Sequence, residues 1–372
     1  MSRKIAILGA GNGGYATAAH QALNGHQVNL WSRSDKNLKP ILEKKGITIH
    51  GEAGEGFARL NYVSTDIGQV IKGVEVIFIV LPSFAVESVV EKCIPYLEDG
   101  QIMVLNLAST GTALRINEIL KKYHVNKKIY ITEFSSLTYG CRINKPGEVT
   151  VQLLAKNIKC ANFPSKDNEK IYPILKEFYP DLVLAENVLE TSLNNGNPVT
   201  HPAPSLLNAG RIEYSDGEFY LYTEGITPSV VKVIEAVDGE RIQICRQFGF
   251  EEIPVEKRLA RIGYTDKAES LYKQYSKSDV FSQMKGPGSL QNRYITEDIP
   301  YGLVVWASLA KTIGAQTHNM DSIITLASSL LNRDLWYEGW TIDKLGLEGM
   351  NFEEIQQYLF TGEPFGNFEY SA

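Results

Sequence analysis

Short apolar runs alternate with segments of helical periodicity through the first half of the chain. The run at residues 76–80 is almost wholly apolar, which indicates a central strand buried on both faces. Residues 149–154 alternate β-branched side chains and are expected to pair antiparallel with residues 159–163. The other predicted strands are residues 5–8, 28–31, 47–50, 59–63, 102–105 and 129–132. This alternation predicts an α/β fold with a mostly parallel, twisted sheet and helices on both faces.

The pattern changes near Glu186, where the strand-like runs stop and long helical patterns take over. Residues 229–248 carry apolar positions at a spacing close to that of a helix, and residues 301–313 and 322–331 predict helices with continuous apolar faces. A chain of 372 residues is also long for a single hydrophobic core. We therefore expect a sheet domain over residues 1–188, an all-helical domain over residues 189–372, and an active site in the cleft between them.

The turn after the first strand carries glycines in the spacing G-x-G-x-x-G. Gly9 is expected to make the tight turn, Gly11 to let backbone amides approach a pyrophosphate, and Gly14 to let the helix pack closely on the strand. Asn12 and Gly13 open the helix, whose N-terminal N–H groups would face the phosphates. This β-α-β unit predicts a Rossmann-type, doubly wound domain that binds NAD or NADP. The alternative is a structural glycine turn without a ligand.

The end of the second strand indicates which dinucleotide to expect. An acidic residue there would bind the ribose 2′-hydroxyl of NAD, but the chain has Ser32 and Arg33. Ser32 can donate to a phosphate oxygen, and Arg33 can stack on adenine while it pairs with a 2′-phosphate. Stacking alone would also fit an NAD enzyme, but we favour NADP. Pro82, at the carboxyl end of the central apolar run, is expected to line the same cofactor site.

The composition is that of an ordinary globular protein, with 44% hydrophobic and 22% charged residues. A net charge of −6 and the lack of a basic run argue against a nucleic-acid partner. The longest apolar stretch is interrupted and too short to span a bilayer, and the first strand leaves no room for a signal peptide. Widely spaced cysteines fit reduced thiols better than disulfides or a metal site. We therefore expect a cytoplasmic protein without membrane contact or metal.

A nicotinamide enzyme needs a proton donor or acceptor beside the carbon that receives hydride, and histidine suits this role near neutral pH. His201 lies in a cluster of asparagines and prolines that opens an amphipathic helix. The prolines would stiffen this segment and hold the side chain at a fixed geometry. The alternative is a helix-capping segment with an incidental histidine. Asp321 also opens a helix, where a capping role is its simplest explanation.

Two segments of the second domain carry a more specific signal than the glycine turn. They are residues 197–213, NPVTHPAPSLLNAGRIE, and residues 293–304, RYITEDIPYGLV. Together they resemble the helical domain of the octopine/nopaline (opine) dehydrogenase family, and the resemblance covers nearly the whole chain. It implies NAD(P)H-dependent reductive condensation of a 2-oxo acid with the amine of an amino acid. It also implies a histidine–aspartate dyad, which maps onto His201 as acid/base and Asp321 as the carboxylate that orients it.

Both substrates of such a reaction carry carboxylates, so cationic or amide donors are needed near them. Arg142 lies in a segment that resembles a family loop lining the substrate site, and Asn197 and Arg293 belong to the two quoted segments. Each arginine could bind a carboxylate or form a structural ion pair. Glu297 and Asp298 are expected to be structural, as partners of Arg293 or of a helix end.

Two other interpretations stay open. A reductase of the glycerol-3-phosphate or ketopantoate type shares the architecture but relies on a lysine acid, and no lysine lies in a polar helix-start cluster like that of His201. A non-catalytic NAD(P)-sensing protein would bind the cofactor without oxidising it. Aromatic residues at 335–340 could form a homodimer interface or a lid, and the aromatic tail, residues 352–370, is expected to pack on the helical domain. The sequence selects neither the amino acid nor the 2-oxo acid.

Overall fold

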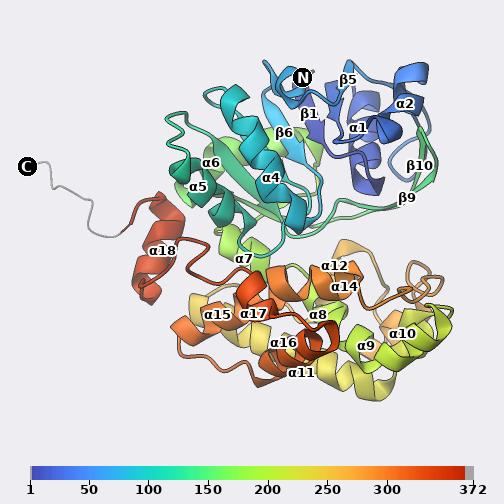
Figure 1. Cartoon of the computed structure of the whole chain (residues 1–372), viewed down its shortest axis with the longest axis vertical. Helices are drawn as coiled ribbons and strands as arrows, with labels where there is room; N and C mark the ends of the chain where they lie inside the picture. Colours follow the sequence, from blue (N-terminus) through green and yellow to red (C-terminus); the bar gives the residue numbers. More distant parts are fainter. Residues whose placement is uncertain (1, 365–372) are drawn as a thin grey trace, which may run out of the picture. The chain divides into compact units, whose positions relative to one another are not determined.

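A computed structural model describes residues 2–364 of the chain. The backbone divides into two compact units, each built from more than one stretch of sequence (Figure 1). The first takes in the chain up to Ala108, Thr112–Thr191 and Leu359–Gly362. The second takes in Ser109–Gly111 and Ser192–Tyr358. The short exchanged segments are a feature that the sequence pattern did not indicate.

The first unit is built on an eight-stranded sheet in the order β12-β11-β8-β7-β6-β1-β2-β5. Its strands are β1 Lys4–Leu8, β2 Gln27–Trp31, β5 Tyr62–Ser64, β6 Val76–Ile79, β7 Ile102–Leu105, β8 Tyr130–Phe134, β11 Lys159–Phe163 and β12 Val183–Leu184. Every neighbouring pair is parallel except β8 and β11. The central strand β6 is buried along its whole length, as its apolar run predicted. The predicted doubly wound α/β sheet is confirmed.

A second, four-stranded sheet has the order β4-β3-β10-β9. Its strands are β3 Gly46–Gly51, β4 Gly56–Arg59, β9 Tyr139–Lys145 and β10 Glu148–Leu154. The predicted pairing of residues 149–154 with 159–163 is wrong, because β10 pairs antiparallel with β9 and parallel with β3, while β11 joins the main sheet. Pro146 and Gly147 form a two-residue turn between β9 and β10, and such a turn favours the local hairpin.

The helices of the first unit are α1 Asn12–Leu23, α2 Asp35–Lys44, α3 Ile67–Ile71, α4 Ser83–Cys93, α5 Thr112–Lys122, α6 Asn168–Phe178 and the start of α7 Val188–Leu193. Side-chain caps begin three of them: Ser34 accepts from the Lys36 N–H at α2, Asp66 from the Gln69 N–H at α3, and Asn187 from the Leu189 N–H at α7. Small residues of α1 are fully buried, so this helix packs closely and contacts both sheets.

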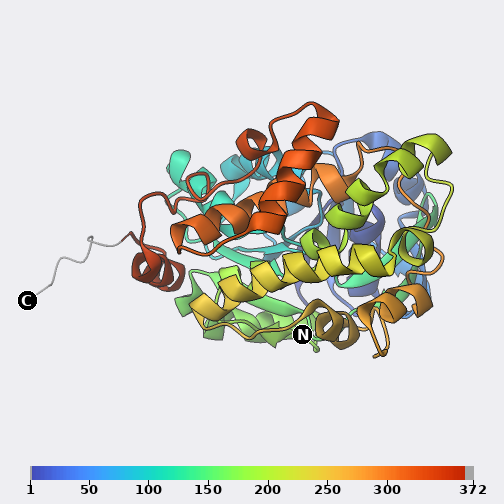
Figure 2. The same cartoon turned by 90° about the horizontal axis from the view of Figure 1, so that it is seen from below.

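The second unit is helical, as predicted, and its described residues hold only one isolated β-bridge, between Tyr220 and Lys285. Its helices are α8 Asn197–Thr200, α9 Pro202–Leu207, α10 Ala209–Ser215, α11 Pro228–Phe248, α12 Val255–Ile262, α13 Leu271–Lys277, α14 Arg293–Thr296, α15 Val304–Thr312, α16 His318–Leu331, α17 Leu335–Glu338 and α18 Phe352–Thr361, the last reaching into the first unit. Two π-helical turns, η3 Leu221–Gly225 and η4 Ile299–Leu303, interrupt the α-helices. The long helix α11, yellow in Figure 2, contacts α8, α9 and α16.

Several general expectations can be compared with the described residues. All four cysteines are free thiols, and burial raises the pKa of Cys93 and of Cys160 to about 12. Between residues 2 and 364, no helix is both long and apolar enough to cross a membrane. The aromatic tail packs on the helical unit at Phe352, whose ring contacts Phe248 with centroids 5.0 Å apart. Phe360, by contrast, is exposed and lies in the segment Leu359–Gly362 of the first unit, so the prediction fails at this residue. The part of the tail beyond residue 364 lies outside the described residues.

Candidate active site

The glycine turn between β1 and α1 is closed on one side and open on the other. A Cβ on Gly14 would lie 1.9 Å from the carbonyl oxygen of Gly9, and a Cβ on Gly9 would lie 2.4 Å from that of Val80. A Cβ on Gly11 would meet nothing within 4 Å. Gly11 precedes the first turn of α1, and no side chain caps that end. The turn therefore has the open space and the unpaired N–H groups that a dinucleotide pyrophosphate needs.

The two residues after Gly11 hold the turn in place. The Asn12 side-chain oxygen accepts a hydrogen bond from the backbone N–H of Ile143 at 2.9 Å, which ties the start of α1 to β9. Gly13 leaves room for Leu137 and Val80, whose side-chain carbons would lie 3.0 Å from a Cβ placed there. Both positions therefore shape the turn, and any contribution to phosphate binding would come from their backbone N–H groups.

The residues predicted to select the cofactor follow β2 and β6. Ser32 is buried, and its hydroxyl accepts from the N–H of Ser34 at 3.4 Å. Arg33 is exposed. Pro82 directly precedes α4 in extended conformation, at the carboxyl end of β6. These residues and the glycine turn follow parallel strands, and their side of the sheet is where doubly wound folds bind nucleotides.

In the second unit, His201 is hydrogen-bonded to Asp298. The Nδ1 atom lies 2.7 Å from a carboxylate oxygen of Asp298, and the two side chains are 14% and 10% exposed. Burial raises the pKa of Asp298 above its usual 3.8, although the hydrogen bond with His201 opposes this. No partner is recorded for Nε2 of His201 among the described residues. The pair has the geometry of a carboxylate that orients an acid–base imidazole.

This arrangement corrects the prediction for the carboxylate partner. Asp321 lies in the first turn of α16, where it accepts a 3.3 Å hydrogen bond from the hydroxyl of Thr317. No hydrogen bond or ion pair joins Asp321 to His201 in the part of the chain that the structure describes. Asp321 therefore lies near the start of α16, as expected, but it does not cap the helix, because the N-cap residue is Thr317 and no side chain caps that end. Asp298, which was expected to be structural, is the residue hydrogen-bonded to His201. The sequence feature that could have indicated Asp298 is its position between Glu297 and the apolar segment 299–305.

Two neighbouring elements set the distance between the pair. His201 follows α8 and its N–H donates to the Asn197 carbonyl at 3.0 Å. Asp298 begins the π-helical turn η4, where its carbonyl accepts from the Leu303 N–H at 3.1 Å. A Cβ on Gly302 would lie 2.4 Å from the Pro198 ring, so a glycine is needed for η4 to contact α8 this closely. π-Helical turns occur frequently at functional sites.

An aromatic ring covers the imidazole. Tyr294 stacks on His201 with ring centroids 4.1 Å apart and planes inclined by 26°. Tyr222, itself fully buried, is hydrogen-bonded to Tyr294, and burial raises the pKa of Tyr222 well above its usual range. The imidazole is therefore held at Nδ1 and against one face. Sequence reasoning missed Tyr294, although it lies in one of the two quoted segments.

The predicted substrate-binding residues have different surroundings. Arg293, at the start of α14, forms an ion pair with the buried Glu297 one turn later. Asn197 begins α8 and is half-buried, and its N–H donates to the Asn195 side chain at 3.0 Å. Arg142 is exposed on β9 of the first unit. The structure therefore brings Arg293 and Asn197 into the unit of His201, and leaves Arg142 in the nucleotide unit.

Comparisons with known proteins agree with this division. Residues 184–331 match the family described as NAD/NADP octopine/nopaline dehydrogenase, alpha-helical domain. Residues 4–135 match the N-terminal part of NAD-dependent glycerol-3-phosphate dehydrogenase. An opine dehydrogenase of Arthrobacter sp. (strain 1C) is 36% identical over 355 residues, which cover 95% of this chain and 98% of that protein. The protein ocs of Agrobacterium tumefaciens (strain Ach5) is 25% identical over 364 residues, or 96% of this chain and 99% of that protein.

Solved structures share the fold over nearly the whole length. Octopine dehydrogenase with NADH and L-arginine has a TM-score of 0.78 at 20% identity, covering 99% of this chain and 100% of that one. Yersinopine dehydrogenase with NADP⁺ bound has a TM-score of 0.70 at 14% identity, covering 96% and 98%. The fold, the glycine turn and the close sequence relative lead to one conclusion: the chain belongs to the opine dehydrogenase family of NAD(P)-dependent oxidoreductases.

Proposed function

We propose that this protein condenses a 2-oxo acid with the amine of an amino acid and reduces the product with NAD(P)H, using His201 and Asp298 as its acid–base pair. The observation that carries the assignment of the pair is the 2.7 Å hydrogen bond between Nδ1 of His201 and the Asp298 carboxylate. It leaves Nε2, the nitrogen on the opposite side of the ring, for the substrate. Asp321, which the sequence favoured, is not part of this proposal.

The nucleotide would be held by the glycine turn Gly9–Gly14 and the carboxyl ends of β2 and β6. When bound, it supplies a hydride to the carbon of the C=N bond formed between the two substrates. The chain provides for phosphate binding through the open backbone at Gly11 and the uncapped start of α1.

Condensation of a carbonyl with an amine expels water, so a proton must reach the carbonyl oxygen. Nε2 of His201 would donate that proton, and Asp298 would stabilise the positive charge on the ring before the transfer. With Nδ1–H donating to Asp298, one ring tautomer is fixed after the proton has left. Tyr294 keeps the ring plane in position by stacking. General acid–base assistance of this kind contributes roughly 10²–10⁴-fold to turnover.

A photometric screen of NADPH and NADH oxidation tests the proposal. The purified protein is mixed with pyruvate and other 2-oxo acids, alone and with amines that include L-arginine, small apolar amino acids and taurine. Oxidation that requires both partners supports the condensation. Oxidation with the oxo acid alone would instead make the protein a simple 2-oxo acid reductase, and binding without oxidation would make it a sensor.

For the cofactor, we propose NADP rather than NAD. The first carboxylate after β2 is Asp35, which begins α2, whereas Ser32 and Arg33 directly follow the strand. The exposed Arg33 forms no ion pair within the described chain. We expect a lower KM for NADPH than for NADH. The Arg33→Ala change should raise the KM for NADPH by about tenfold, the effect of losing one charge-assisted contact, and leave that for NADH nearly unchanged. Equal effects on both cofactors would assign Arg33 to adenine stacking alone.

Cytoplasmic location and a homodimeric assembly also stay proposals from the sequence. Cell fractionation tests the first, and the mass of the protein in solution tests the second.

A further inference from the structure

Arg258 is a buried cation in the second unit that has no partner. The residue lies in α12 and is 8% exposed, and no hydrogen bond, ion pair or ring contact of its side chain is recorded with the described residues. Burial lowers the pKa of Arg258 to about 10, so the guanidinium is still charged at neutral pH. A buried charge without a counter-ion or hydrogen bonds weakens a fold. The buried Arg258 guanidinium therefore calls for a functional explanation.

A neighbouring arginine shows what a structural guanidinium in this unit looks like. Arg241 of α11 is 1% exposed and donates to Asp238 at 2.7 Å. It also donates to the Leu193 carbonyl at 3.0 Å and to the Ile253 carbonyl at 2.6 Å. Asp238 in turn accepts from the Val255 N–H at 2.8 Å, at the start of α12. Arg241 thus fastens α11 to its neighbours, a role for which Arg258 has no contacts.

The Arg258 guanidinium lies against the segment that carries His201. A Cβ on Gly196 would lie 1.6 Å from one terminal nitrogen of Arg258 and 1.8 Å from its central carbon. Gly196 directly precedes the four-residue helix α8, and His201 directly follows it. Five residue steps of helical rise place the two backbones ~7.5 Å apart along the axis. Thr200, which directly precedes His201, is held in the same unit, because its hydroxyl is 2.9 Å from that of the buried Tyr275.

The guanidinium nitrogens are buried but not completely enclosed. The fully buried side-chain atoms that lack a partner in the described residues belong to Gln21, Thr110, Ser205, Thr265, Gln274 and Trp306. No nitrogen of Arg258 is among them, although none has a partner, so each keeps some exposed surface. A small anion that bound these nitrogens would displace no protein ligand.

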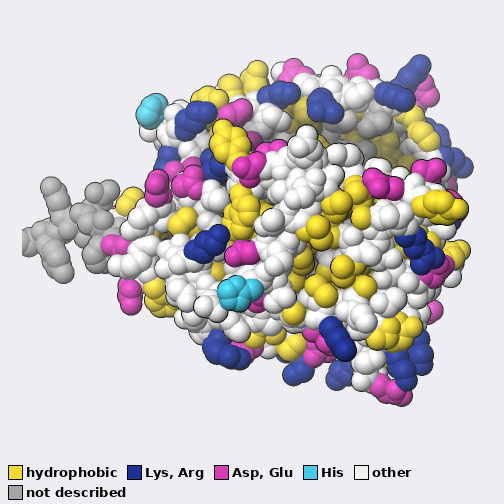
Figure 3. Space-filling model, turned by 60° about the horizontal axis from the view of Figure 1, so that its bottom comes forward, with side chains coloured by type: hydrophobic (Ala, Val, Ile, Leu, Met, Phe, Trp, Pro, Cys, Tyr) yellow, Lys and Arg dark blue, Asp and Glu magenta, His cyan; other side chains and the backbone are white. Residues whose placement is uncertain are grey.

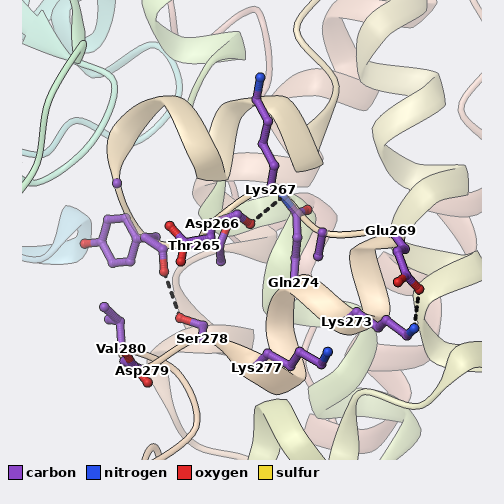
Figure 4. Close-up of a pocket in the computed structure, with 13 residues that line it drawn as sticks. Thr265, Asp266, Lys267, Glu269, Lys273, Gln274, Lys277, Ser278, Asp279 and Val280 are labelled. Carbon is purple, nitrogen blue, oxygen red and sulfur yellow. Dashed lines mark hydrogen bonds and ion pairs between the residues drawn. The ribbon is translucent and has the colours of Figure 1, made fainter.

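A large cavity at the end of α12 does not supply the missing negative charge. It has a volume of about 770 Å³ and is lined by the loop after α12 and by α13 (Figure 4). Its lining contains Lys267, Lys273 and Lys277 against Asp266, Glu269 and Asp279, so its formal charges balance. The amide of Gln274 donates to the carbonyl of Glu256 and to that of Asp266, which joins this cavity wall to α12. The unbalanced cation of this region is Arg258.

We propose that Arg258 binds a carboxylate of a substrate and positions it relative to His201. The proposal rests on the proposed function, in which the 2-oxo acid and the amino acid each bring a carboxylate. Guanidinium and carboxylate match as a pair of parallel hydrogen bonds, and the missing counter-ion would arrive with the substrate. Without the substrate, the unpaired charge lowers the stability of the protein, a trade-off that is common at functional sites.

Steady-state kinetics of Arg258→Gln and Arg258→Lys test the proposal. The control is Arg261→Gln, which changes an exposed arginine of the same helix that pairs with Glu251 at 2.7 Å. The substrates are pyruvate with the most active amino acid from the screen, and pyruvate with the amine that lacks its carboxylate. We expect R258Q to raise one substrate KM by about 10- to 100-fold, the range for a hydrogen-bonded charge pair. R258K should restore part of the affinity, and R261Q should resemble the wild type.

The two substrate sets distinguish the two carboxylates. If Arg258 binds the amino acid, R258Q raises its KM but not the KM of the amine without a carboxylate. If Arg258 binds the oxo acid, R258Q raises the KM of pyruvate with both amines. Unchanged KM values for every substrate would overturn the proposal, and so would an equal rise in all KM values, NADPH included.

Thermal melting of the protein without substrate separates this role from a structural one. We expect R258Q to melt at or above the wild-type Tm, because it removes a buried charge and loses no bond, while Arg241→Gln melts lower. A lower Tm for R258Q with unchanged KM values would identify Arg258 as structural. If the wild type oxidises no NADPH with any substrate pair, the proposed function fails. Calorimetry of pyruvate binding to the NADPH complex of wild type and R258Q then decides the role of Arg258 separately, and equal affinities would overturn it.

Discussion

The His201 ring is restrained by contacts of three kinds. The ring Nδ1 atom is hydrogen-bonded to Asp298, and the ring face stacks on Tyr294. The backbone N–H of His201 donates a hydrogen bond to the carbonyl of Asn197. A ring held in this way loses little freedom when a substrate binds, which favours proton transfer along a fixed direction. Burial disfavours the charged form of Asp298 and raises its pKa, although the hydrogen bond with His201 opposes this.

The raised pKa of Asp298 predicts the acidic limb of the pH profile. In the proposed mechanism turnover requires the Asp298 carboxylate. Protonation of a group with a raised pKa begins at a higher pH than usual. Turnover should therefore fall with decreasing pH while the pH is still above 3.8, the ordinary value. The measurement is kcat/KM against pH for the wild type and for Asp298→Asn. The variant should be slow and lack this limb; an unchanged acidic limb in the variant would assign it to another group.

The polar, proline-rich surroundings of His201 were visible in the sequence, but its hydrogen bond to Asp298 was not. His201 and Asp298 are 97 residues apart, and no local pattern reports a contact over that distance. The sequence favours a structural role for Asp298, as a partner of Arg293 or of a helix end. In the structure Arg293 forms its ion pair with Glu297, one helical turn away. Asp298 is instead hydrogen-bonded to His201.

At the scale of elements, the contact between α8 and η4 matters most. Gly302 of η4 touches Pro198 of α8, and these two elements carry Asp298 and His201 at their ends. A sequence pattern predicts a single helix over residues 301–313, whereas the structure has a π-helical turn followed by α15. Periodicity in apolar residues does not distinguish a π-helical turn from an α-helix, so this feature lay beyond sequence reasoning.

A methyl group at residue 302 should separate the two elements. In Gly302→Ala the new Cβ would meet the Pro198 ring at 2.4 Å, so one element must shift and the bond between His201 and Asp298 must lengthen. We expect kcat to fall by about 10²-fold, as for a displacement on the order of 1 Å, with NADPH affinity unchanged.

Gly239→Ala is the matched control for this change. Gly239 lies inside α11, where a Cβ would meet nothing within 4 Å, so this variant should keep kcat and gain helix stability. Steady-state kinetics and thermal melting compare the two variants. A Gly302→Ala enzyme with wild-type kcat would show that the α8–η4 contact does not set the catalytic geometry.

At the scale of the whole molecule, both units and their classes followed from the pattern of apolar runs, while the exchange of short segments did not. Ser109–Gly111 belongs to the helical unit and Leu359–Gly362 to the sheet unit. A single boundary along the sequence cannot describe such exchanges, because they depend on packing between distant stretches.

On the face drawn in Figure 3, basic and acidic side chains are interspersed, so that face has no extended field of one sign.

The stability of the molecule should depend on His20. Burial lowers the pKa of His20 from 6.5 to about 4, and its ring is bonded to the hydroxyl of Tyr139. Between these two pH values the unfolded chain binds the proton and the folded protein does not, so stability should fall as the pH decreases through this window. Thermal melting from neutral pH downward measures the effect. His20→Gln should reduce the pH dependence, whereas the exposed His124→Gln should not; an equal slope in all three proteins would contradict this account.

The turnover of three variants under identical conditions tests the central assignment most directly. His201→Asn, Asp298→Asn and Asp321→Asn are compared with saturating NADPH and the substrate pair from the screen, and NADPH affinity is measured for each. We predict that the changes at His201 and Asp298 lower kcat by roughly 10²–10⁴-fold with NADPH affinity retained, and that the change at Asp321 leaves kcat close to the wild type. Loss of turnover in Asp321→Asn together with normal turnover in Asp298→Asn would contradict the assignment.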